Sequence, residues 1–174
     1  MKRGDFVEFK RSGPVATVLG GLLKLFERDW DGWGWHLAIL WEKRSEGWMI
    51  LESVKNGVSL NYYPNKDLER TRIWLWFEEL PTREVMEIFY KDHIGKRYDA
   101  AIYFWTVLQY IIRHYFNHRI PRLLDDRFTC WELVFWFARC MGKPIQSVYD
   151  CPIITDFLKV MEVGISPPGS DSAN

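Results

Sequence analysis

The hydrophobic pattern of this chain changes its period near residue 80. Before that point, short apolar runs are separated by turn-forming residues, a pattern typical of β-strands. From Pro81 onward the apolar residues recur at helical spacing, and Pro81 itself stands where helices commonly begin. We therefore expect strands before this point and helices after it, with one amphipathic helix near the N-terminus as the exception.

The predicted elements follow from this pattern and from the turn residues beside each run. The predicted strands cover residues 6–9, 35–41, 48–52, 58–62 and 72–77. The predicted helices cover residues 15–27, 82–92, 100–116, 130–141 and 153–161. The segment 164–174 is rich in Ser, Pro and Gly and is expected to be a disordered tail. The length fits a single domain over residues 1–163.

Charge and cysteine content argue against several classes of protein. Lys plus Arg and Asp plus Glu number 23 each, so no overall field attracts nucleic acid. The three cysteines form no CxxC pair, which argues against a disulfide framework and a four-thiolate zinc site. The first residues lack the apolar core of a signal peptide, and no apolar run is long enough to span a bilayer. We expect a soluble cytoplasmic protein without a transmembrane segment.

Cys130 stands at the predicted boundary between a loop and an apolar helix. Thr129 fits the N-cap position, and Leu133, Val134 and Phe137 follow at helical spacing. The unpaired N–H groups of a helix N-terminus, with a histidine nearby, favour the thiolate form of a cysteine. Cys130 is therefore a candidate nucleophile, although a free cysteine considered alone is more often a small buried core residue.

A histidine and a carboxylate stand on the second and third predicted strands. If these strands form an antiparallel hairpin in which Leu40 pairs with Trp48, His36 lies directly opposite Glu52. The carboxylate would then fix one imidazole tautomer and leave the other ring nitrogen for a thiol. A register slip of one residue would turn Glu52 to the opposite face.

Four stretches of the chain resemble the circularly permuted branch of the NlpC-type papain-like superfamily. RGDFV at 3–7 resembles the opening Gly-Asp strand of that family, and GWHLAIL at 34–40 resembles its SHVAIV strand with the histidine. ILES at 50–53, together with Gly57 and Val58, resembles the VIEA…GV strand of the family. The fourth, GKRYD at 95–99 leading into TCWELV at 129–134, resembles GKPYD and CSELV. Histidine and acid precede the cysteine, the reverse of ordinary papain, and the likeness covers most of residues 3–160.

The resemblance implies an α+β, papain-like fold in which a curved antiparallel sheet, or half-barrel, packs against helices. It implies that Cys130 is the nucleophile, His36 the general base and acid, and Glu52 the group that orients His36. The implied reaction is hydrolysis of an amide bond, in a peptide or a cell-wall peptide, through a Cys thioester acyl-enzyme. This chemistry requires no metal or organic cofactor.

Two bulky tryptophans depart from the family pattern. Trp35 replaces the small residue before the histidine, and Trp131 replaces the serine after the cysteine. Both are candidate substrate-binding residues, as is Tyr98, for which we favour the other interpretation, a structural turn before the helix. Because the chain is 17% aromatic, an acyl-lipid substrate for a hydrolase or acyltransferase is an alternative. A module that binds an acyl chain or a peptide without turnover is another.

A metal site is the third class of function considered. His114 and His118 lie at i and i+4, a spacing that could place both on one helix face. Because the sequence offers no evident third ligand, we interpret them as solvated or phosphate-facing residues.

Overall fold

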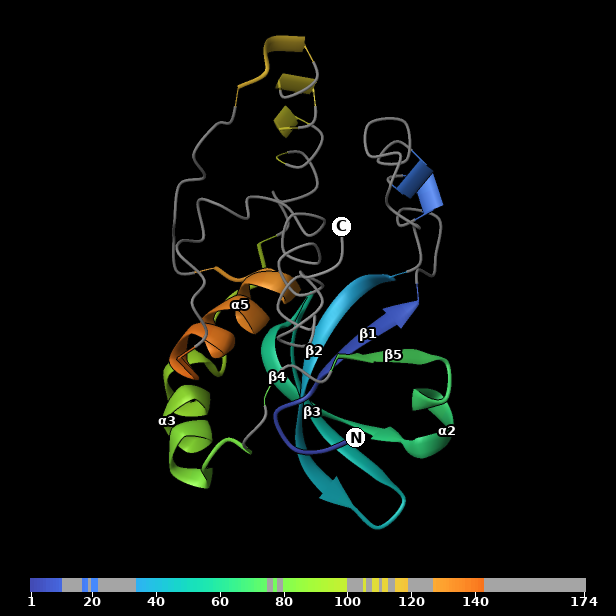
Figure 1. Cartoon of the computed structure of the whole chain (residues 1–174), viewed down its shortest axis with the longest axis vertical. Helices are drawn as coiled ribbons and strands as arrows, with labels where there is room; N and C mark the ends of the chain where they lie inside the picture. Colours follow the sequence, from blue (N-terminus) through green and yellow to red (C-terminus); the bar gives the residue numbers. More distant parts are fainter. Residues whose placement is uncertain are drawn as a thin grey trace, which may run out of the picture.

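The chain forms an α+β structure built on one antiparallel sheet (Figure 1). The computed structural model describes residues 1–10, 17–18, 20–21, 34–74, 77, 80–99, 105, 108–109, 111–112, 115–118 and 127–142. Within these residues, five strands form the sheet in the order β4-β3-β2-β1-β5 and three helices pack against it. The elements are β1 (Phe6–Lys10), β2 (Gly34–Arg44), β3 (Gly47–Val54), β4 (Gly57–Pro64), α2 (Asn65–Leu68), β5 (Thr71–Trp74), α3 (Arg83–His93) and α5 (Cys130–Cys140).

The five predicted strands and two of the predicted helices are confirmed. β2 and β3 extend beyond their predicted ends because they form one long hairpin, and β5 ends at Trp74 rather than at residue 77. The short helix α2 was not predicted. The predicted helices 15–27 and 100–116 fall largely outside the described residues. Helix 153–161, the tail 164–174 and the domain end at 163 fall entirely outside them.

The sheet has apolar clusters on both faces because apolar residues alternate along its strands. Figure 1 shows α3 and α5 together on one side of the sheet. In the same view, α2 lies away from them, near β5. The cluster on the α5 side joins strand residues Phe6, Leu37, Ile39 and Leu51 to helix residues Met86, Phe89, Leu133, Val134 and Phe137. The second cluster contains Val7, Ala38, Leu40, Trp48, Ile50 and, from α2, Leu68.

The predicted register between β2 and β3 was wrong by two residues. Leu40 pairs with Ile50, not with Trp48, and Trp48 pairs with Lys43. The hairpin turn is shorter than expected, and an irregularity between Leu40 and Glu42 adds a residue to β2. A shift of two residues preserves the face of every side chain, so His36 and Glu52 still point to the same side of the sheet.

Candidate active site

His36 and Glu52 form a direct contact on neighbouring strands. His36 lies near the start of β2, and Glu52 lies near the end of β3. Continuing the observed register puts Glu52 opposite Ala38, so His36 is its diagonal neighbour, within reach of long side chains. His36 Nε2 donates to Glu52 Oε2 at 2.6 Å. The Glu52 side chain is only 2% exposed, whereas that of His36 is 24% exposed, so the carboxylate is buried behind the ring.

Two further donors hold the other carboxylate oxygen of Glu52. Asn61 Nδ2 and the Tyr63 hydroxyl, both from β4, each donate to Oε1 at 2.8 Å. Burial alone would raise the pKa of Glu52, but the hydrogen bonds from His36, Asn61 and Tyr63 bring the pKa below its usual value. Burial and the charge of Glu52 raise the pKa of Tyr63, which therefore remains a donor. Glu52 is a fixed anion with both oxygens hydrogen-bonded.

Cys130 is the first residue of α5, and its helix start is strongly specified. Thr129 caps the helix: its hydroxyl accepts from the Glu132 N–H at 3.3 Å, and Glu132 Oε2 accepts from the Thr129 N–H at 2.8 Å. This capping box satisfies two of the donors that a helix N-terminus leaves open. Cys130 is 6% exposed. The capped N-terminal end of α5 therefore holds Cys130 in a fixed position.

The loop before Cys130 is tied to the sheet and to the segment 95–99. Ser53 Oγ donates to the Phe128 carbonyl at 2.6 Å. The Phe128 N–H donates to the Arg97 carbonyl at 2.9 Å, and Tyr98 forms an isolated parallel bridge with Phe128. Arg97 and Tyr98, both within the GKRYD stretch, therefore position the loop that leads to Cys130.

The two halves of the site meet at His36. Burial alone would lower the pKa of His36, but a hydrogen bond and charge interaction with Cys130, and the same with Glu52, raise it to about 10. Because Nε2 is bonded to Glu52, Nδ1 is the ring nitrogen that remains for the thiol. The Phe9 ring packs against the imidazole at 5.6 Å between centroids and against Tyr63 at 5.1 Å. The structure thus brings together all three residues predicted as catalytic.

The predicted substrate-binding residues have different surroundings. Trp131 is 3% exposed and belongs to the core cluster on the α5 side. Tyr98 is half-buried beside Phe128, consistent with the structural turn given as its other interpretation. Trp35 lies in β2, but its side chain is outside the described residues. The role of all three in substrate binding stays a prediction.

Sequence reasoning missed the residues that support Glu52 and the loop before Cys130. These are Phe9, Ser53, Asn61 and Tyr63. A signal for the pair on β4 was present: a tight turn at Lys55 and Asn56 before Gly57 fixes the β3–β4 register, which pairs Glu52 with Ser59. Alternation from Ser59 then puts Asn61 and Tyr63 on the face of Glu52.

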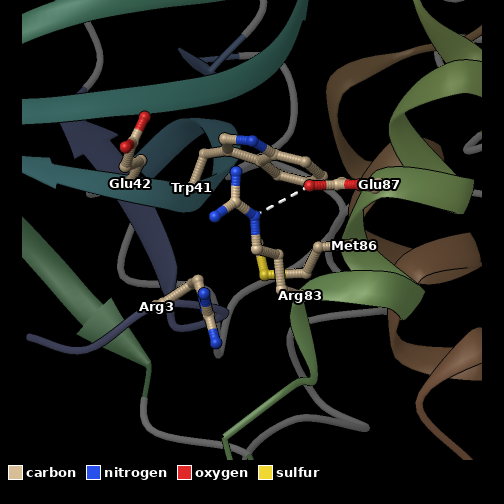
Figure 2. A pocket seen from close by; sticks show the side chains of 6 residues that line it. All are labelled: Arg3, Trp41, Glu42, Arg83, Met86 and Glu87. Carbon is tan, nitrogen blue, oxygen red and sulfur yellow. Dashed lines mark hydrogen bonds and ion pairs between the residues drawn. The ribbon is translucent and has the colours of Figure 1, made fainter.

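A pocket elsewhere in the described structure is separate from this site. It lies further along β2, near the start of α3. Arg83 Nε donates to Glu87 Oε1 at 2.8 Å, the contact drawn as a dashed line in Figure 2. The residues that line it are Arg3, Trp41, Glu42, Arg83, Met86 and Glu87. It contains none of the residues predicted as catalytic or substrate-binding.

The metal and membrane alternatives concern other parts of the chain. His118 is exposed, and His114 lies outside the described residues. In the described ranges, no group of three or more His, Cys, Asp or Glu side chains could hold a metal ion. Within the part of the chain that the structure covers, no helix is both long and apolar enough to span a membrane.

Comparisons with known proteins give no family assignment. No protein-family model matches this sequence, and no curated protein matches it.

Proposed function

We propose that this protein is a cysteine hydrolase with the circularly permuted, papain-like fold of the NlpC type. The observation that carries the proposal is the position of His36, which interacts with Glu52 through Nε2 and also with the Cys130 thiol. A nucleophile, a base and a group that orients the base are the parts that covalent acyl transfer needs. The favoured substrate is an amide bond in a peptide or cell-wall peptide, because this is the broader chemistry of the resembled family.

The reaction begins with the thiolate of Cys130 and a protonated His36. The sulfur attacks the substrate carbonyl carbon, and the oxygen of the tetrahedral intermediate becomes negatively charged. The backbone N–H of Cys130, in the first turn of α5, is a candidate donor to this oxyanion. His36 gives its proton to the leaving amine as the carbon–nitrogen bond breaks, leaving a thioester on Cys130.

Hydrolysis of the thioester restores the enzyme. Neutral His36 takes a proton from water, and the resulting hydroxide attacks the thioester carbonyl. The carbon–sulfur bond breaks, the acid leaves, and the thiolate and imidazolium are restored. Glu52 stays ionised throughout and holds the ring through Nε2, while Asn61 and Tyr63 hold Glu52.

Turnover by site variants tests this proposal. A panel of fluorogenic peptide amides and acyl esters is assayed with the wild type, Cys130→Ala, His36→Ala and Cys140→Ala. Cys140 is the matched control because it lies at the exposed end of the same helix. We expect amide cleavage that is abolished in Cys130→Ala and unchanged in Cys140→Ala, and intact mass should show an acyl adduct on Cys130. Full turnover by Cys130→Ala would contradict the mechanism, and cleavage of acyl esters alone would favour the lipid alternative.

A further inference from the structure

Glu8 is a buried carboxylate on the strand beside His36. It lies on β1, is 1% exposed and pairs with Leu37 of β2. Trp74 of β5 donates its indole N–H to Glu8 Oε2 at 3.0 Å. A buried carboxylate is costly to desolvate and is a weak source of stability even when bonded. In the sheet Glu8 stands between Leu37 of β2 and Arg72 of β5, so its carboxylate is held at a fixed place beside the start of β2.

The carboxylate of Glu8 packs against the backbone of Gly34. A Cβ atom added to Gly34 would lie 1.6 Å from Glu8 Oε1 and 2.2 Å from its carboxyl carbon. The Glu8 side chain therefore fills the space that any side chain at residue 34 would need. Only glycine is compatible with this close approach.

Gly34 begins a β-bulge that ends at His36. Phe9 pairs with His36, but the next residue of β1, Lys10, pairs with Gly34, which leaves Trp35 as an additional residue in β2. A bulge bends its strand and changes the direction of the neighbouring side chains. The bend matters here, because alternation gives His36 the face of Ala38 and Leu40, whereas Cys130 belongs to the cluster on the α5 side.

We infer that Glu8 is a positioning residue for His36. Its carboxylate accepts a hydrogen bond from Trp74 and packs against the backbone of Gly34. This contact fixes the bulge, and the bulge orients the imidazole toward Cys130. Phe9, the next residue of β1, supports the ring itself. Glu8 acts through the backbone of β2, and the inference rests on the proposed function because it assigns Glu8 to the same site.

The test compares three variants with different effects on this contact. Glu8→Ala removes the carboxylate, Glu8→Gln keeps its shape and an acceptor for Trp74, and Gly4→Ala is a destabilised control. The added Cβ of Gly4→Ala would meet Pro81 Cγ at 2.4 Å, and Gly4 bonds to Leu40, further along β2 from His36. The readouts are the pH profile of Cys130 alkylation and the His36 pKa measured by NMR.

The expected effect is specific to the site. Glu8→Ala should slow alkylation of Cys130 near neutral pH by about tenfold. This is less than the loss of about 100-fold that misplacing a reacting group by about 1 Å can cause. Glu8→Ala should also move the His36 pKa toward that of free imidazole, while Glu8→Gln and Gly4→Ala keep the wild-type profile. If Glu8→Ala does not fold, Trp74→Phe provides a milder change that should shift both readouts in the same direction.

Two results overturn the inference, and neither is the failure of the proposed function. The first is a Glu8→Ala protein that is less stable yet keeps the wild-type pH profile and His36 pKa. The second is a Gly4→Ala protein that shifts both readouts as much as Glu8→Ala does. Failure of the proposed function is a different result, in which the wild type itself shows no His36-dependent alkylation. The NMR titration then still compares Glu8→Ala with the wild type.

Discussion

Ser53 donates a 2.6 Å hydrogen bond to the carbonyl of Phe128. Ser53 is fully buried and follows Glu52 on β3, so the two side chains point to opposite faces of the sheet. Glu52 holds His36 on one face, and Ser53 holds the loop to Cys130 on the other. One strand therefore fixes both the proposed base, His36, and the loop that carries the proposed nucleophile, Cys130.

Removal of the Ser53–Phe128 hydrogen bond should make the loop before Cys130 less rigid. Ser53→Ala leaves the Phe128 carbonyl with its 3.3 Å bond from the Asp99 N–H, so the loss should be close to that of one net hydrogen bond. We expect a decrease in the free energy of unfolding of about 1 kcal/mol, measured in urea, and slower alkylation of Cys130. Ser45→Ala, in the exposed turn between β2 and β3, is the control and should change neither quantity. Unchanged alkylation in Ser53→Ala would exclude this role.

His36 should stay charged at neutral pH. Burial opposes the charge, but Cys130 and Glu52 outweigh it and raise the pKa to about 10. Since the folded-state pKa is above the unfolded value, the stability from this charge is complete below about pH 6.5 and is lost as the pH rises through about 10. NMR of the imidazole should show this high pKa, and Cys130→Ala and Glu52→Gln should each lower it. A wild-type midpoint near 6.5 would contradict the arrangement.

Glu52→Gln should weaken both stability and activity, but should reduce activity less than His36→Ala does. The Gln amide replaces one acceptor oxygen with a donor, which conflicts with one of the donors around Glu52. Because the folded-state pKa of Glu52 is lowered, its charge stabilises the fold above the usual pKa of 4.5, and the stability is lost as the pH falls. Thermal unfolding should show a large difference from the wild type near neutral pH and a smaller one at about pH 3. A difference independent of pH would count against the charged role.

Tyr63→Phe tests the support behind the acid, and Tyr62→Phe is its matched control. The Tyr63 hydroxyl bonds to Glu52, whereas Tyr62 is the adjacent residue on the opposite face and is 49% exposed. Loss of a hydrogen bond to a charged group costs about 1.5–3 kcal/mol. We expect Tyr63→Phe to lose stability in this range, with Tyr62→Phe close to the wild type. Equal effects of the two variants would show that the hydroxyl of Tyr63 has no special role.

The sequence was informative where local patterns determine the structure and less so where long-range pairing does. Thr129 was predictable as the N-cap of α5 because capping depends on a few adjacent residues. The contact of His36 with Glu52 was predicted from the wrong register, and it survives because a shift of two residues keeps both side chains on one face. The bulge at Trp41 and the burial of Glu8 depend on pairing between distant segments, and no local pattern indicates them.

The measurement that tests the central claim most directly is the pH dependence of Cys130 alkylation by iodoacetamide, followed by intact mass. Cys130→Ser identifies the labelled residue, and His36→Ala tests the partner. Cys140 should react little near neutral pH, because partial burial and the charge of Asp92 raise the pKa of its thiol. We predict rapid labelling of Cys130 below about pH 7 that requires His36. Labelling that occurs only above about pH 8.5, the ordinary range of a thiol, and is unaffected by His36→Ala would contradict the account.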